Sequence, residues 1–153
     1  MKSVKGDLEE SRLQLRRVGP DEPAVDLMGW LLKDVSRMLE SDSTLGGLRS
    51  SHYRVLRAVP RGGIRITELG ARVGMTTAGS GQFVKTLVES GHLRVEVDDA
   101  DRRSRVVVRT VAGDRAVVAI GRCIRRIEDG WAKRVGASRY DAFRVVLAEI
   151  ADG

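Results

Sequence analysis

The segment from residue 64 to residue 110 constrains the fold of this chain more than any other. It begins with a short apolar stretch at Ile64 and Ile66, continues with two helix-length patterns separated by Gly74, and ends in two alternating strand patterns around a polar turn. A glycine between two helical patterns is typical of a tight turn, because it adopts the positive φ that such turns often require. The segment therefore predicts helix, turn, helix and a two-stranded hairpin.

The second helix of this segment has two distinct sides. We expect Thr76 to be its N-cap and Gly91 to end it after Ser90. On a helical wheel, one side packs inward with Ser80, Phe83, Val84 and Leu87. The opposite side carries Ala78, Gly81, Gln82 and Lys85. Glycine in a helix costs about 1 kcal/mol relative to alanine. Two interpretations of Gly79 and Gly81 stay open. Either the helix is marginal until DNA orders it, or Gly81 lets the backbone approach DNA closely.

The hairpin pattern consists of two strands and an arginine-containing tip. Leu93, Val95 and Val97 alternate with polar residues, and we expect Val106 and Val108 to be the apolar positions of the returning strand. The tip reads Asp98-Asp99-Ala100-Asp101-Arg102-Arg103-Ser104-Arg105. Its arginines either pair with the aspartates as solvated turn charges or enter a DNA minor groove. Beside a helix suited to a major groove, we favour the second interpretation.

The basic charge of the chain is concentrated in the same region. The whole chain has 27 basic and 21 acidic residues, for a net charge of +6. Residues 48–110 contain twelve basic and six acidic residues. The net positive charge of this region therefore equals that of the whole chain. A localised basic surface on a helix-turn-helix pattern indicates double-stranded DNA as a partner.

Particular side chains of this region suit particular DNA groups. Glutamine matches adenine, and lysine matches guanine or phosphate, which assigns base contacts to Gln82 and Lys85. Thr76, Thr77 and Ser50, the last a predicted N-cap of a helix over 51–59, suit phosphate contacts that fix register. The predicted DNA-contacting residues are Ser50, Thr76, Thr77, Ala78, Gly81, Gln82, Lys85, Arg102, Arg103 and Arg105.

Enzymatic and metal-binding motifs do not fit this sequence. Gly79-Ser80-Gly81 is neither a P-loop nor a nucleophile elbow, because the required lysine or strand-turn context is missing. We therefore expect no catalysis, no cofactor and no metal site. The single Cys123 excludes an internal disulfide and is interpreted as a buried small residue, with a redox sensor as the alternative. Without a signal-peptide or membrane-span pattern, we expect a cytoplasmic protein with no membrane partner.

The remaining helices suggest a homodimer built from both ends of the chain. Residues 1–22 form a flexible arm or an extra dimer helix, and 23–153 form a single domain with its reading unit at 48–110. We expect dimerisation helices at 23–40, at 111–135 with Thr110 as N-cap, and at 138–151 with a capping box at Ser138 and Asp141. The middle helix has an apolar stripe long enough for a seam with another helix: Val117, Ile120, Ile124, Ile127, Trp131 and Val135.

Several motifs in this order resemble those of MarR-type winged-helix transcriptional regulators. They are Ile-Thr-Glu-Leu-Gly-Ala-Arg-Val-Gly at 66–74, Gly-His-Leu at 91–93, the aspartate and arginine turn at 98–103, and Thr-Val-Ala-Gly at 110–113. The resemblance covers residues 24–150. It implies a mainly α, triangular homodimer with helix 76–90 in the major groove and the wing in the minor groove of a palindromic operator. Asp99 and Ala100 stand where the family commonly has proline and arginine.

The resemblance also implies a regulatory function. Family members are mostly repressors that are released by small aromatic or anionic compounds, or by cysteine oxidation. His52, Tyr53 and Trp30 lie where such effectors often bind, although packing is the simpler interpretation of each residue. The sequence therefore predicts a repressor of a palindromic operator with a small-molecule effector. The alternative is a winged-helix interaction or architectural module without sequence-specific DNA reading.

Overall fold

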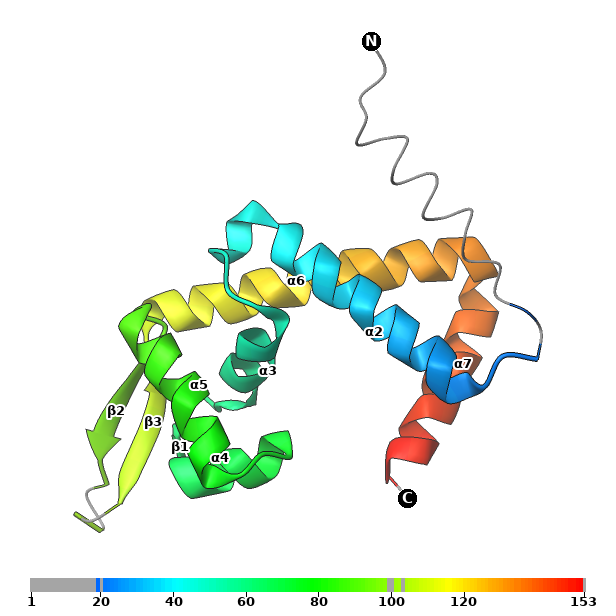
Figure 1. Ribbon diagram of the computed structural model, residues 1–153. Coiled ribbons are helices and arrows are strands. Elements are labelled where there is room, and N and C mark those ends of the chain that lie inside the picture. Colours follow the sequence, from blue (N-terminus) through cyan, green and yellow to red (C-terminus); the bar gives the residue numbers. More distant parts are fainter. Residues whose placement is uncertain (1–18, 20, 99–100, 103, 153) are drawn as a thin grey trace. The chain divides into compact units, whose positions relative to one another are not determined.

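The computed structural model describes residues 19, 21–98, 101–102 and 104–152, and it confirms a mainly α winged-helix fold (Figure 1). The chain divides into two compact units, Met1–Asp34 and Val35–Gly153. The predicted arm at 1–22 lies almost entirely outside the described residues, so its role stays a prediction. The elements are α2 (Ala24–Ser41), the 3-10 turn η1 (Ser43–Leu45), α3 (Ser50–Ala58), β1 (Ile64–Arg65), α4 (Ile66–Val73), α5 (Thr77–Glu89), β2 (Leu93–Val97), β3 (Arg105–Arg109), α6 (Val111–Val135) and α7 (Ala137–Asp152).

One hydrophobic core occupies the second unit and is shared by its helices and its sheet. The elements from the end of α2 to α6 contribute their apolar sides, as the helical and strand periodicities predict, whereas α7 adds no residue to this core. Burial of such side chains stabilises the fold by about 1.5–3 kcal/mol each. The fully buried apolar residues are Val55, Leu56, Val59, Leu69, Leu87, Val107 and Ile120.

The turn between α4 and α5 has the geometry that Gly74 predicts. Gly74 has φ 66°, and its N–H bonds to the carbonyls that end α4. At Gly70 a side chain would meet the Met75 carbonyl and Ser80 Oγ, both at 3.1 Å. Ser80 is fully buried, and its hydroxyl donates to the Thr77 carbonyl. Helices α4 and α5 therefore approach each other closely at small residues, which fixes the direction of α5.

The wing belongs to a three-stranded antiparallel sheet of order β1-β3-β2. In Figure 1 the β2–β3 hairpin extends away from α6. From the sequence, residues 64–66 are predicted only as a short apolar stretch. In the structure, Ile64 and Arg65 form strand β1 and pair with Val107 and Val106. The expected apolar face of β3 was wrong. Val107 is the fully buried residue, because Val106 and Val108 lie on the opposite face near Gly63, where a side chain would meet the Val106 Cγ1 at 2.7 Å.

Two of the four predicted caps are confirmed and two are wrong. Thr76 Oγ1 accepts from the Gly79 N–H and Thr110 Oγ1 from the Gly113 N–H, each at 3.1 Å. Helix α3 already includes Ser50, and its N-cap position is Arg49. Helix α7 begins at Ala137, so Ser138 lies inside it. Helix α3 starts at Ser50 and α7 starts one residue before Ser138, so neither serine occupies the N-cap position.

Helices α6 and α7 differ in how they use their apolar residues. The middle of α6 buries Ile120, Cys123 and Ile127 in the core of its own unit, so this part of the predicted stripe is not free for a partner helix. Of α7, only Tyr140 is buried, and Ile150 is 70% exposed. Across the described part of the chain, no helix has the length and apolar character to cross a membrane.

Candidate nucleic-acid interface

The exposed side of α5 carries the residues that the helical wheel predicts. Ala78, Gln82 and Lys85 are exposed, and Phe83, Val84 and Leu87 pack against the core. Around Gly81, a Cβ atom would meet nothing within 4 Å. The exposed side of α5 therefore consists of small residues, from which the amide of Gln82 and the ammonium group of Lys85 project. The ammonium of Lys85 lies 4.0 Å from the Glu89 carboxylate, with both side chains more than 60% exposed, so this contact leaves Lys85 free to move.

The N-terminal end of α5 adds hydroxyl groups beside this surface. Thr76 and Thr77 are exposed, and the Thr76 hydroxyl is already engaged as the N-cap acceptor. A hydroxyl that accepts one hydrogen bond can still donate its own proton. The start of a helix also carries partial positive charge, which favours a phosphate. This end of α5 can therefore hold an anionic backbone while its exposed side faces bases.

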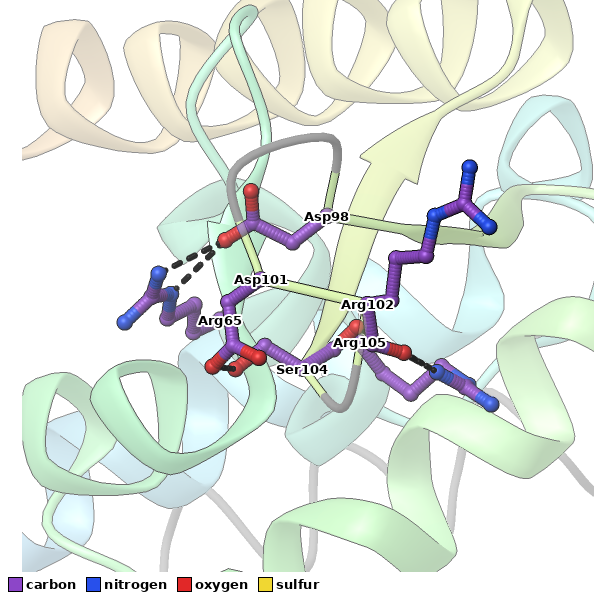
Figure 2. Close-up of polar contacts among 6 residues, drawn as sticks. All are labelled: Arg65, Asp98, Asp101, Arg102, Ser104 and Arg105. Atoms are coloured by element: carbon purple, nitrogen blue, oxygen red, sulfur yellow. Dashed lines mark hydrogen bonds and ion pairs between the residues drawn. The ribbon is translucent and has the colours of Figure 1, made fainter.

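The tip of the wing is closed by a compact set of hydrogen bonds. The Asp98 N–H donates to the Ser104 carbonyl at 3.1 Å, and the Ser104 N–H donates to the Asp101 carbonyl at 2.8 Å. Ser104 Oγ donates to the Asp101 carboxylate at 2.7 Å. Arg105 Nη1 donates to the Arg102 carbonyl at 3.1 Å, as Figure 2 shows. Arg105 therefore supports the turn from one side.

A second contact holds the turn from its other side. The Nε and Nη2 atoms of Arg65 donate to the same Asp98 carboxylate oxygen at 3.0 and 2.7 Å (Figure 2). The side chain of Asp98 is 16% exposed and that of Arg65 is 43% exposed. The hydrogen bond with Asp98 raises the pKa of Arg65. Sequence analysis missed this pair, because its members are 33 positions apart and lie in different elements.

The predicted wing arginines have different surroundings. Arg102 is exposed, and in Figure 2 its side chain points away from the Arg65–Asp98 pair. Arg105 is also exposed, and its guanidinium bonds to backbone carbonyls of the turn. Arg103 lies outside the described residues, so its predicted contact stays a prediction. Arg102 is thus the described arginine that extends from the tip.

Comparison with known proteins identifies the family of this arrangement. The model of the MarR family matches residues 46–104, the part of the chain that contains α3, α4, α5 and β2 and continues to the wing tip. This winged-helix segment is therefore similar to the MarR family. A comparison with curated proteins found no match.

Solved structures of MarR-family regulators share this fold over most of their length. A crystal structure of MarR superposes with a TM-score of 0.78 at 21% identity, covering 90% of this chain and 94% of that one. The transcriptional repressor CouR, bound to a 23-mer DNA duplex, gives 0.71 at 20% identity with 99% of both chains covered. The PcaV regulator of Streptomyces coelicolor, in complex with its natural ligand, gives 0.69 at 22% identity, covering 90% and 98%. At these identities the likeness concerns the fold.

Two further polar groups of the chain lie near α5 or α3. The Ser50 N–H donates to the Glu40 carboxylate at 2.9 Å, which places a negative charge beside the predicted phosphate contact. That contact therefore stays a prediction. Arg54 Nη2 donates to the Val73 carbonyl at 3.1 Å, so a side chain of α3 satisfies the end of α4 just before the turn. Sequence analysis missed Arg54, because no local pattern marks an arginine that bonds a carbonyl 19 positions away.

The predicted effector residues differ in burial. Tyr53 is 2% exposed, and its hydroxyl donates to the Leu45 carbonyl at 3.2 Å, an arrangement that packing alone accounts for. The ring of His52 meets that of Phe83 edge-on with centroids 5.2 Å apart. Within the described residues, His52 Nδ1 has no hydrogen-bond partner, and burial together with Arg49 lowers the pKa of this histidine. Trp30 belongs to the first unit, and its predicted role stays untested.

The single cysteine of the chain is buried beside an arginine. Cys123 is 4% exposed, in agreement with its interpretation as a small core residue. Hydrogen bonds with the Cys123 sulfur and with the Asp42 carboxylate raise the pKa of Arg126, whose Nη2 lies 2.6 Å from Asp42. Whether the thiol responds to oxidants stays a prediction. In the described ranges, no group of three or more His, Cys, Asp or Glu residues could hold a metal ion.

Proposed function

We propose that this MarR-family transcriptional regulator is a homodimeric repressor that reads a palindromic operator and is released by a small-molecule effector. The observation that carries this proposal is the exposed side of α5, where Gln82 and Lys85 stand above the small residues Ala78 and Gly81. A helix with this surface can approach the floor of a major groove at Ala78 and Gly81, where no large side chain separates its backbone from the base edges, while Gln82 and Lys85 reach toward those edges. Its function is binding, and we expect no catalysis.

Base reading in this proposal depends on Gln82 and its neighbours. A glutamine amide can bond both N6 and N7 of adenine, and an alanine methyl can contact the methyl group of thymine. Lys85 serves guanine or phosphate. Thr76, Thr77 and Ser50 fix the register of the helix through phosphate contacts. We therefore expect sequence preference to come mainly from Gln82, Lys85 and Ala78.

The wing supplies the second contact. Arg102 and Arg103 reach the minor groove, where a narrow A·T-rich segment attracts arginine through its enhanced negative potential. Arg105 contacts the backbone beside them. Asp98 does not oppose this assignment, because it already pairs with Arg65.

The proposed dimer is supported by apolar residues that the single chain leaves exposed. In α7 they are Phe143 at 39%, Val146 at 51% and Ile150 at 70%, and in α2 Val25 is 72% exposed. Large apolar residues that are exposed on one helix, as in α7, are typical of an interface. We expect light scattering to give the mass of two chains at micromolar concentration. A monomer under these conditions would contradict the dimer and the palindromic operator with it.

Repression and release are supported by what related structures contain. CouR is described as a transcriptional repressor bound to DNA, and the PcaV structure contains a natural ligand. We infer an aromatic or anionic effector for this chain and assign it to His52 and Tyr53, whereas the role of Trp30 in the first unit stays a separate prediction. Of these, His52 has a polar ring atom available for a ligand, because Nδ1 is without a partner in the described part of the chain.

Selection of bound sequences from a random DNA pool tests the proposal. We expect enrichment of one inverted repeat, with half-sites about one helical turn apart, because two copies of α5 must enter successive major grooves. Affinities for the selected site and for random DNA are then compared across salt concentrations. Equal affinities for both would contradict sequence-specific reading and favour an interaction or architectural module.

A further inference from the structure

The Arg65–Asp98 ion pair joins two parts of the winged unit that come from separate elements. Arg65 ends β1 and occupies the N-cap position of α4, where its side chain makes no capping hydrogen bond. Asp98 directly follows β2, at the point where the hairpin begins its turn. The pair therefore connects the first helix of the helix-turn-helix to the tip of the wing.

The geometry of this pair is that of a strong hydrogen-bonded ion pair, although it lies near the surface. Two donors of Arg65 converge on one oxygen, at 3.0 and 2.7 Å. Charge-assisted hydrogen bonds of this kind are about twice as strong as neutral ones. The Asp98 side chain is only 16% exposed, so water competes less for it than for a surface carboxylate.

We propose that Arg65 and Asp98 act as a brace that holds the wing tip in its DNA-binding position, so that Arg102 meets the minor groove without prior ordering of the turn. Arg65 and Asp98 are thus positioning residues. This inference depends on the proposed function, because it assumes that the wing contacts DNA.

The backbone of Asp98 shows how the brace would act on the tip. Its N–H donates to the Ser104 carbonyl and its carbonyl accepts from the Asp101 N–H, so the residue that Arg65 holds is also a corner of the turn. Arg102 lies inside that turn. Fixing Asp98 therefore limits the positions of Arg102, and a side chain that is ordered before binding loses less entropy when it binds.

The direction in which DNA affinity changes when Asp98 loses its charge distinguishes the brace from a purely electrostatic effect. Asp98 is a negative charge on a hairpin that faces a polyanion. If it acted only through its charge, removing it would strengthen DNA binding. If it acts as a brace, removing it weakens DNA binding, and the two explanations predict opposite changes.

Asp98→Asn provides this test, with Glu96→Gln as its matched control. Both changes remove one negative charge from the wing and release one arginine, since Glu96 pairs with Arg94 at 2.6 Å on the same strand. We expect Asp98→Asn to weaken binding to the selected site about threefold to tenfold, the range for a half-buried charged hydrogen bond. Glu96→Gln should bind with equal or higher affinity. Asp98→Asn that binds as tightly as the wild type, or more tightly, would overturn the brace.

Arg65→Lys tests the other partner without changing the net charge. Lysine keeps the charge but cannot place two fixed donors on one oxygen, so we expect a similar loss of affinity. In the double variant with Asp98→Asn, the loss should not exceed that of the larger single change, because both remove the same contact. Additive losses would mean that Arg65 binds DNA independently, which contradicts the brace.

Two readouts keep this test separate from a folding defect and from the proposed function. The variants should stay fully folded at the temperature of the binding assay, with only a small fall of the thermal unfolding midpoint from the lost ion pair. The salt dependence of binding should keep its slope, because no phosphate contact is removed. A lowered midpoint that accounts for the affinity loss would count against a positioning role. If the wild type itself shows no preference for the selected site, the proposed function fails, whereas normal wild-type binding with unaffected variants overturns only the brace.

Discussion

Helix α5 and the tip of the β2–β3 hairpin are held in place by different forces. Helix α5 is anchored by Ser80, Val84 and Leu87, all of which are buried in the core. In β2 only Leu93 is buried, and the tip beyond it is held by polar contacts around Asp98. A core contact is insensitive to salt, whereas a contact between partly exposed charges weakens as the Debye length falls to about 8 Å at physiological ionic strength. The two DNA-facing parts therefore respond differently to solution conditions.

This difference also separates what each part can contribute to recognition. A helix fixed by packing presents its side chains at a constant angle, which suits the discrimination of base edges. A tip fixed by ion pairs and turn hydrogen bonds can adjust locally, which suits contact with a groove of variable width. The following changes test this contrast, from the largest expected effect to the smallest.

Leu87→Ala should have the largest effect, because Leu87 is fully buried on the inward side of α5. Truncation of a buried leucine lowers the free energy of unfolding by about 2–5 kcal/mol. Denaturant unfolding measures this change, and Val88→Ala at the neighbouring position, where the side chain is 37% exposed, is its control. Similar losses for both variants would mean that α5 is not anchored by its inward side.

Gln82→Ala should reduce the discrimination between the operator and random DNA. A lost bidentate base contact lowers discrimination by about 1–3 kcal/mol, and the affinity for random DNA should hardly change. Binding titrations with both DNAs measure the ratio. An equal loss on both would assign Gln82 to the DNA backbone instead of the bases.

The double change Arg102→Ala and Arg103→Ala should weaken binding to all DNA. It should also lower the slope of log K against log salt concentration by about 1.8, because each lost phosphate contact removes about 0.9. Arg122→Ala with Arg125→Ala removes the same charge from the exposed surface of α6 and serves as the control. Wild-type affinity and slope in the wing variant would show that the wing does not touch DNA. A loss concentrated on sites with A·T-rich flanks would assign an arginine to a narrow minor groove.

A change in pH should have the smallest effect, through His52 beneath α5. Its pKa is lowered from 6.5 in the folded chain, chiefly by burial, so the unfolded state binds the proton more readily. The stability of the fold should therefore fall as pH decreases through the unfolded pKa of about 6.5. Unfolding at pH 7.5 and at pH 5.5 measures this loss, which should be smaller in His52→Gln. An equal pH dependence in both proteins would remove His52 as its source.

The elements of the fold could be predicted because their signals are local. The periodicity of α5 and α6, the alternation of β2 and the two threonine caps each depend on residues within a few positions of one another. Strand β1 could not be predicted, since Ile64 and Arg65 become a strand only by pairing with β3. Ser50 and Ser138 were wrongly predicted as N-caps, because serine is also common inside the first turn of a helix. The N–H groups at these helix starts already have backbone acceptors, because the Arg49 carbonyl accepts from His52 and Tyr53 and the Gly136 carbonyl accepts from Tyr140.

The candidate interface could be predicted only in part, for the same reason. The exposed side of α5 follows from helical geometry alone, so Gln82 and Lys85 were assigned to it correctly. The contacts that set the wing tip involve Arg65, whose partner is determined by how the sheet brings β1 beside β3. Arg54 likewise acts on the end of α4 through tertiary structure. A helical wheel or a strand alternation pattern contains no information about contacts between side chains of different elements.

Gly113 determines where the hairpin can vary over evolution. A side chain at this position would collide with the His92 carbonyl, and the Thr110 hydroxyl donates to the Gly91 carbonyl at 2.6 Å. The stem is thus attached to the start of α6 at a point without spare room, and an inserted residue there would break both contacts. At the tip, between Asp98 and Ser104, extra residues would extend into solvent. A change in the length of the arm should therefore destabilise the fold less at its tip than at its stem, where Gly113 and Thr110 contact His92 and Gly91.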